Sequence, residues 1–218
     1  MEPGKERGDD ARGLGRSEKV SADLNMPTKT QLLEPRVATE AWIRRGLMDF
    51  FLAFELFRHV NIHLFFLQQG IEKFCKAYLI ALKKAEYQNS APDQATEWID
   101  NFAKGLRHDL VGLIRDVSAT EVALKPWLQN SAFLDLLNRA EQEGRYPIPI
   151  AKSIYEDHGL AAVVSDRNYK QAFAMGKAIL DQLEISSGWA FSLEALMPRS
   201  ISKEDWDRFV RVWEMSHG

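Results

Sequence analysis

Arginine, histidine and lysine side chains are the groups in this sequence whose types and spacing point to chemistry on a phosphate. Arg107 and His108 are adjacent, and Lys73 and Lys76 lie close together in an apolar stretch. Histidine exchanges protons near neutral pH, and cationic side chains stabilise the negative charge of a phosphate. These four residues are therefore predicted to contact a phosphate or nucleotide. A structural interpretation stays open: His108 orients two helices, and Lys76 forms a surface ion pair with Glu72.

Metal and thiol chemistry are less well supported. Glu55, His59 and His63 recur at every fourth residue, as zinc ligands on one helical face would. A predicted helix break falls between the two histidines, and no metalloprotease glutamate lies between them. Cys75 lies in an apolar stretch, where it is expected to act as a small hydrophobic residue. There is no glycine-rich phosphate loop, and we expect neither a metal nor a cofactor.

The composition limits the class of protein. The chain has 218 residues, with 28 Lys+Arg against 31 Asp+Glu and a formal net charge of -3. This balance argues against binding of nucleic acid through bulk positive charge, although it leaves room for a local basic patch. The single cysteine excludes an intramolecular disulfide and a cysteine-based zinc site. The sequence therefore indicates one soluble, cytoplasmic domain with a tail.

The N-terminal stretch differs in composition from the rest. Residues 1–36 contain no aromatic side chain, although the whole chain has 6 Trp, 5 Tyr and 12 Phe. Glycine, proline and mixed charges predict a disordered or loosely attached tail there, with features of neither a signal peptide nor a transit peptide. The expected organisation is a tail at 1–36, a helical bundle at 37–190 and a C-terminal helical extension at 191–218.

Apolar residues at helical spacing predict an all-α fold. The first two helices, at 39–58 and 61–84, should form an antiparallel hairpin, with Asn61 as the N-cap of the second. The remaining helices are expected from a start at Pro92-Asp93 through Trp98 to Ile114, from Pro126 in a short piece, at 165–187, and after a capping box at Ser202. Residues 143–149 are expected to be a loop, and 161–164 are the one strand candidate. The predicted architecture is an antiparallel up-and-down bundle of four to five helices with a short C-terminal helix.

The first two predicted helices are apolar over more than one stripe, whereas a surface helix of a monomer needs only one. Charged residues interrupt every apolar run before it is long enough to span a membrane. The extra apolar face is therefore predicted to meet a second subunit in a homodimer. The residues expected in that interface are Phe51, Phe54, Phe65 and Phe66.

Three motifs follow one another along the chain: QQGIEKFCKA at 68–77, RHDL at 107–110 and RYP at 145–147. In this order and at these intervals, they resemble the HEPN (higher eukaryote and prokaryote nucleotide-binding) domain family over about residues 40–188. The resemblance implies a four- or five-helix bundle that dimerises. Members of this family frequently act together with nucleotidyltransferases, in toxin and antitoxin modules, or in RNA processing, and the resemblance implies a role of this kind here.

Many active members of that superfamily are metal-independent ribonucleases with an arginine and a histidine near the start of the final helix. The best match here is Arg167, but Ala172 and Phe173 stand where the histidine is wanted. Neither residue can transfer a proton, so the ribonuclease motif is incomplete. Arg145 does not complete it, because the next histidine, His158, lies beyond two prolines.

The sequence therefore predicts a HEPN-like homodimeric binding or interaction module for nucleotide or RNA in a defence or regulatory setting. The predicted ligand-binding residues are Lys73, Lys76, Arg107, His108, Arg145 and Arg167. One alternative is a metal-independent ribonuclease with a non-standard acid/base pair, for which His108 and Arg167 are the catalytic candidates. The other is a non-catalytic scaffold or antitoxin-like subunit whose partner is a nucleotidyltransferase or another protein.

Overall fold

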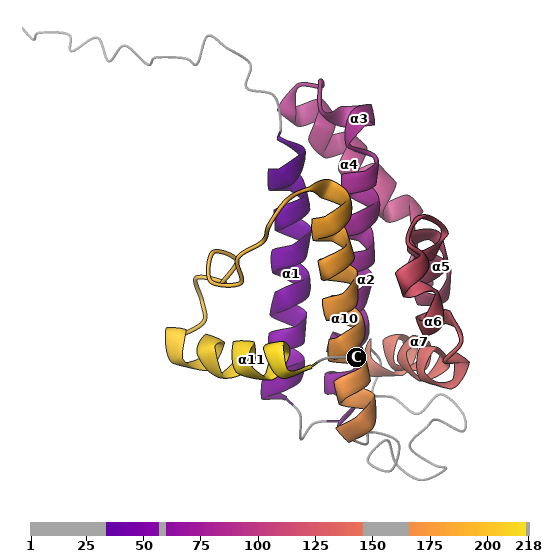
Figure 1. Ribbon diagram of the computed structural model, residues 1–218, viewed down its shortest axis with the longest axis vertical. Helices are drawn as coiled ribbons and strands as arrows, with labels where there is room; N and C mark the ends of the chain where they lie inside the picture. Colours follow the sequence, from indigo (N-terminus) through magenta and orange to yellow (C-terminus); the bar gives the residue numbers. More distant parts are fainter. Residues whose placement is uncertain (1–33, 57–59, 146–165, 217–218) are drawn as a thin grey trace, which may run out of the picture. The chain divides into compact units, whose positions relative to one another are not determined.

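The computed structural model describes residues 34–56, 60–145 and 166–216, and in these ranges the chain is helical with no strand. This confirms the predicted all-α class. Residues 1–33, residues 146–149 of the predicted loop and the strand candidate at 161–164 lie outside the described residues, and residues 143–145, also predicted as loop, are helical. The elements (Figure 1) are α1 Pro35–Glu55, α2 Val60–Leu82, α3 Lys84–Tyr87, α4 Pro92–Gly105, α5 Leu110–Thr120, the 3-10 turn η1 Val122–Leu124, α6 Lys125–Leu128, α7 Ser131–Arg145, α10 Asp166–Ser187 and α11 Lys203–Met215.

The hairpin of α1 and α2 is the centre of the fold, as predicted. Pro35 lies in the first turn of α1, where its missing N–H costs no hydrogen bond. The α2 helix already includes Asn61, so the predicted N-cap is wrong by at least one residue. Figure 1 shows α10 lying beside this hairpin, where it packs on α2; α7 and α5 pack on α2 as well.

Two glycines allow α1 and α2 to approach closely. A Cβ atom at Gly46 would lie 2.6 Å from the ring of Phe74, and one at Gly70 would lie 2.6 Å from the ring of Phe50. Each ring therefore lies over the glycine of the opposite helix, and the two ring centroids are 5.4 Å apart. The missing side chains make room for the aromatic centre of the core.

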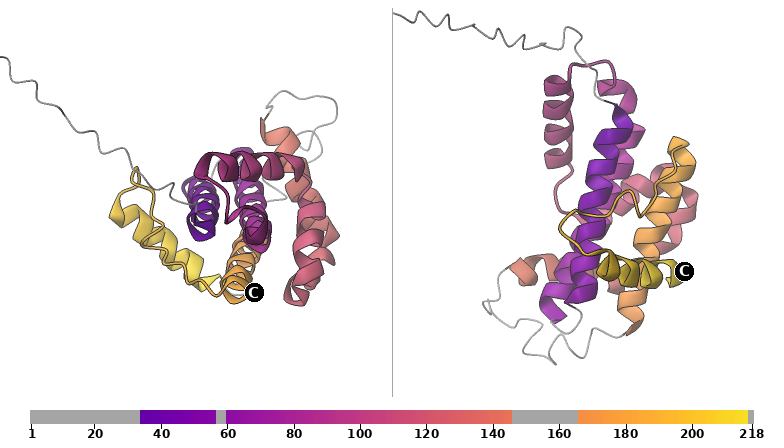
Figure 2. Two further views of the ribbon diagram at one scale, coloured as in Figure 1. Left: turned by 90° about the horizontal axis from the view of Figure 1, so that it is seen from above. Right: turned by 90° about the vertical axis from the view of Figure 1, so that its left-hand side faces the viewer.

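The C-terminal helix α11 belongs to the same core, and Figure 2 shows it crossing α1 and α10. The Trp213 ring lies with its centroid 5.0 Å from that of Phe50 and 5.6 Å from that of Phe173. The Ser202 hydroxyl accepts a hydrogen bond from the Asp205 backbone N–H at 3.2 Å, which confirms the predicted helix start. The aromatic residues of α11 thus cover the bundle of their own chain.

This covering corrects the prediction for part of the dimer interface. Phe51 is only 8% exposed, because Trp206 and Phe209 of α11 lie against it with ring centroids at 6.1 and 5.9 Å. At Phe51, the second apolar face is therefore buried by the chain itself. Phe54 also packs on Phe209. The other two predicted interface residues, Phe65 and Phe66, contact each other and remain half-buried.

The helix predicted to start at Pro92-Asp93 does start there, but its predicted continuation to Ile114 is wrong, because the structure divides it into α4 and α5. Arg107 has a φ angle of 54°, a left-handed conformation that ends helical geometry. Asp109 then caps α5 by accepting a hydrogen bond from the Gly112 backbone N–H at 3.1 Å. His108 consequently lies in a turn between two helices rather than on a helical face.

The region after Pro126 also differs from the prediction. It contains the single turn α6 and then the longer α7, which buries Phe133, Leu134 and Leu137 in the main core. None of the described helices is long and apolar enough to span a membrane.

Candidate functional site

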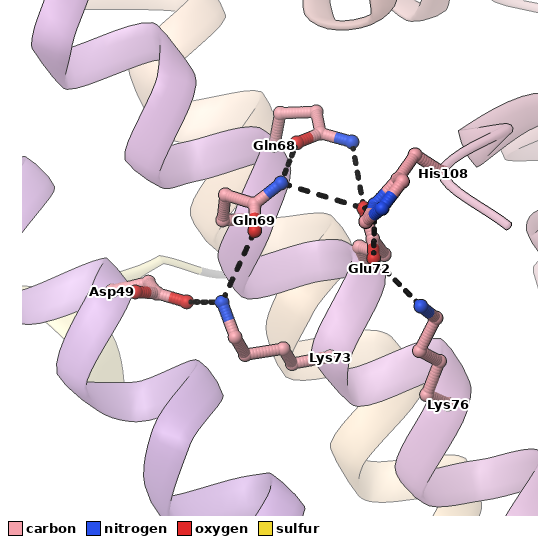
Figure 3. Close-up of polar contacts among 7 residues, drawn as sticks. All are labelled: Asp49, Gln68, Gln69, Glu72, Lys73, Lys76 and His108. Atoms are coloured by element: carbon pink, nitrogen blue, oxygen red, sulfur yellow. Dashed lines mark hydrogen bonds and ion pairs between the residues drawn. The ribbon is translucent and has the colours of Figure 1, made fainter. Parts of the chain in front are cut away.

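A polar cluster centred on Glu72 interrupts the apolar packing around α2 (Figure 3). Glu72 is 3% exposed, and its carboxylate accepts a hydrogen bond from Gln68 Nε2 at 3.1 Å. Lys76 Nζ forms an ion pair with it at 2.9 Å, and the Lys76 side chain is only 6% exposed. Residues four apart lie on one face of a helix, so Gln68, Glu72 and Lys76 form a row along α2.

His108 reaches this row from the turn between α4 and α5. Its Nδ1 lies 3.0 Å from Oε1 and 3.2 Å from Oε2 of Glu72. An ionised carboxylate only accepts hydrogen bonds, so the proton of this contact is carried by Nδ1. The His108 side chain is 53% exposed, and its Nε2 makes no hydrogen bond to any other described residue. The ring is therefore held at one nitrogen and accessible at the other.

A second ion pair joins α1 to the cluster. Lys73 Nζ donates a hydrogen bond to Asp49 of α1 and another to Gln69 Oε1, the latter at 3.3 Å. Gln69 in turn donates to Gln68 Oε1 at 2.7 Å, which connects the second pair to the row on α2 (Figure 3). Two carboxylates and two ammonium groups thus lie in one network, and their formal charges cancel.

Burial acts on the two carboxylates with different results. Burial raises the pKa of Glu72, but the hydrogen bond and charge of Lys76 and the hydrogen bond of His108 outweigh it, so the net pKa lies below its ordinary value. For Asp49, burial outweighs the charge and hydrogen bond of Lys73, and the pKa is raised. The Glu72 carboxylate is therefore ionised at neutral pH.

The structure brings together three of the predicted ligand-binding residues, Lys73, Lys76 and His108, and Arg107 is the exposed neighbour of His108. The ion pair of Glu72 and Lys76 is buried, whereas the sequence indicated a surface pair. Both lysines are held by carboxylates, so the side chains exposed to a ligand are Arg107 and His108. Arg145 ends α7 and Arg167 lies in the first turn of α10, but their side chains lie outside the described residues.

Sequence reasoning missed Asp49 as a member of the cluster. It is a buried charge on an apolar helix, and its partner Lys73 follows 24 residues later on another helix. No local spacing rule connects the two. The sequence did contain one signal, which is a charged residue in the apolar stretch of the first helix. A buried carboxylate requires a partner of opposite charge, so Asp49 could have been expected to pair with a cation.

His63 and Cys75 have no role in this cluster. His63 is fully buried, its Nδ1 lies 2.7 Å from the Ala53 carbonyl oxygen, and its ring stacks on Tyr169. Burial raises the pKa of the Cys75 thiol, which disfavours a nucleophilic thiolate. Within the parts of the chain that the structure describes, no three His, Cys, Asp or Glu residues are placed to hold a metal ion.

Comparison of the chain with protein-family models, with curated proteins and with solved structures found no match. The resemblance to the HEPN family therefore stays a prediction carried by the three motifs, two of which supply the residues of the Glu72 cluster and its turn except Asp49.

Proposed function

We propose that this chain is a HEPN-like binding module that contacts the phosphate of a nucleotide or RNA through His108 and Arg107. The observation that carries the proposal is the arrangement of His108, whose Nδ1 is held by the buried carboxylate of Glu72 while Nε2 is accessible. A ring oriented in this way presents one donor in a fixed direction when it is protonated. The His108 ring loses little conformational entropy when a ligand binds, because Glu72 already holds it in position.

The charges around His108 support an anionic ligand. Lys76 neutralises Glu72, and Lys73 neutralises Asp49. Next to these paired charges, Arg107 and His108 are exposed side chains that can donate hydrogen bonds to an anion. A guanidinium group binds a phosphate through two parallel hydrogen bonds, and an imidazolium adds a third charge-assisted donor.

Binding of a fluorescein-labelled single-stranded RNA by the full chain, followed by fluorescence anisotropy, tests the proposal, with ATP as a competitor. We expect His108→Gln to weaken binding by about tenfold or more, because one charge-assisted hydrogen bond is lost. Lys104→Gln is the matched control: it removes one positive charge from the exposed end of α4, where Lys104 is paired with Asp100. Equal binding by wild type and His108→Gln, or no saturable binding by wild type, would contradict the proposal.

The pair of Glu72 and His108 also favours one alternative, a metal-independent ribonuclease. A carboxylate that holds one nitrogen of an imidazole leaves the other to exchange protons with a substrate, which is the arrangement used in acid/base catalysis. RNA cleavage by the purified chain with EDTA present tests this activity. The alternative requires that His108→Ala and Arg167→Ala each abolish cleavage while the helical circular dichroism is retained. Cleavage that survives both substitutions, or is absent from wild type, would exclude it.

We propose further that the module acts as a homodimer in a defence or regulatory setting. The pair of Phe65 and Phe66 on α2 supports the dimer, because both side chains are only half-buried by the described residues, whereas α11 covers Phe51. Sedimentation of wild type and Phe65→Glu tests it. A change from dimer to folded monomer is expected, and a wild-type monomer or a complex with a second protein would replace the dimer with the scaffold alternative.

A further inference from the structure

A cleft of about 510 Å³ lies between α10, α11 and the connection at residues 188–202, and none of its residues belongs to the Glu72 cluster. Its apolar lining includes Val210, which is half-buried, and the buried side chains of Leu180, Trp206 and Trp213. The Trp206 Nε1–H donates a hydrogen bond to the Leu193 carbonyl oxygen at 3.1 Å, which ties the connection to α11. The volume lies within the range of small-molecule sites in proteins.

The charged residues of the cleft are mostly acidic. They comprise five carboxylates and two lysines: Asp181, Glu184, Glu194, Asp207, Glu214, Lys177 and Lys203. Lys177 is paired with Asp181 at 3.0 Å, and Glu184 accepts a hydrogen bond from the Phe191 backbone N–H at 2.7 Å. Glu214 makes no hydrogen bond or ion pair with any other described residue. Negative charge therefore exceeds positive charge along an open, partly apolar wall.

The chain itself shows that an ammonium group fits between these carboxylates. Lys203 Nζ lies 3.3 Å from an oxygen of Asp207 and 3.6 Å from an oxygen of Glu194. The hydrogen bond and charge of Asp207 raise the pKa of the Lys203 ammonium above its ordinary value. Two carboxylates from different segments thus already share one primary ammonium.

We propose that this cleft binds a linear aliphatic polyamine. In such a molecule, ammonium groups alternate with short methylene chains, and the cleft offers partners for both: carboxylates for the ammonium groups and half-buried apolar side chains for the methylenes. Asp181 and Glu184 lie three apart on α10, a spacing that places their Cβ atoms about 5–6 Å apart, close to the separation of ammonium groups across about four methylenes. The methylene chains would lie on the half-buried side chains of Leu193 and Val210, where they bury apolar surface.

The distribution of the carboxylates favours a polyamine over a metal ion. A divalent cation needs several oxygen ligands converging on one point. The described residues contain no group of three acidic, histidine or cysteine side chains placed in that way. Charges that are spread along a wall suit an extended polycation, which places one ammonium near each carboxylate.

Isothermal titration calorimetry of the full chain with spermidine, at near-physiological salt, tests the proposal independently of RNA binding at His108. We expect saturable binding by wild type, a loss of about tenfold in affinity in the double variant Glu194→Gln with Glu214→Gln, and tighter binding by Lys203→Gln. The last change removes the ammonium that competes for Glu194 and Asp207.

Glu204→Gln is the matched control, because Glu204 is an exposed carboxylate of α11 outside the cleft. Its affinity for spermidine should equal that of wild type. Three results would overturn the proposal: no saturable binding by wild type, an equal loss in the control and the double variant, or complete displacement of spermidine by the same concentration of magnesium. Thermal unfolding of each variant establishes that the fold is retained.

Discussion

The Nδ1 atom of His108 lies 3.0 Å from Oε1 of Glu72, although 36 residues separate the two in the chain. This contact fastens the turn between α4 and α5 to the middle of α2. A charge buried among apolar side chains destabilises a fold unless it is paired and hydrogen-bonded. Glu72 has partners on both sides, so the cluster can orient His108 at an acceptable energetic cost.

Substitution of Glu72 tests the importance of this buried pair. Glu72→Gln keeps the size of the side chain but leaves the buried ammonium of Lys76 without its counter-charge. We expect the free energy of unfolding in urea to fall by about 3–5 kcal/mol. The control is Asp100→Asn, which breaks the exposed pair with Lys104 and should change stability little. Equal effects of the two substitutions would show that the Glu72 pair is not buried in solution.

The buried His63 predicts a dependence of stability on pH. Burial lowers its pKa from 6.5, so the unfolded chain binds the proton more readily than the folded chain. Stability from this residue is therefore fully present above pH 6.5 and is lost as the pH falls through the folded-state pKa. Glu72 adds a loss in the same direction, but only below its ordinary pKa of 4.5.

Urea unfolding between pH 7.5 and pH 5.0 measures the contribution of His63. His63→Asn keeps a donor near Nδ1 for the Ala53 carbonyl but cannot take up a proton. We expect the wild-type unfolding midpoint to fall across this range and the midpoint of His63→Asn to stay nearly level. Parallel curves for the two proteins would assign the pH dependence to other groups.

The close approach of α1 and α2 predicts that alanine is poorly tolerated at two glycines. Gly46→Ala and Gly70→Ala each place a Cβ atom 2.6 Å from a buried phenylalanine ring. We expect each to cost about 1–3 kcal/mol of stability, because the rings cannot move within a packed core. Gly105→Ala is the matched control: no atom lies within 4 Å of its Cβ position, so it should stabilise α4 by about 0.5–1 kcal/mol. Thermal unfolding of the three variants measures these changes in stability. An unchanged melting temperature for Gly70→Ala would contradict the close contact between the Phe50 ring and Gly70.

The contribution of α11 to the core is tested at Trp213. Trp213→Ala removes ring contacts with Phe50, Phe74 and Phe173, and we expect a loss of about 3–5 kcal/mol. Arg211→Ala changes an exposed residue of the same helix and should have little effect. Urea unfolding followed by tryptophan fluorescence and by circular dichroism measures both. A cost for Trp213→Ala no larger than that of the control would mean that α11 docks only weakly.

Much of the fold is predictable from the sequence because helix formation depends on local patterns. The α1 and α2 hairpin, the span of α10 and the Ser202 cap of α11 follow from apolar spacing, proline positions and capping residues. The break between α4 and α5 was not predicted. It depends on the left-handed Arg107 and on the cap of Asp109, and an apolar pattern that continues through both positions hides it.

The sequence by itself determined the all-helical class and singled out Lys73, Lys76 and His108 as candidates for one site. Only the tertiary structure decided that Glu72 joins Lys76 to His108, that Asp49 neutralises Lys73, and that α11 covers Phe51. Periodicity describes which residues share a face of one helix. It carries no information on which faces of distant helices meet, because that choice is made by the packing of the whole core and by the pairing of its buried charges.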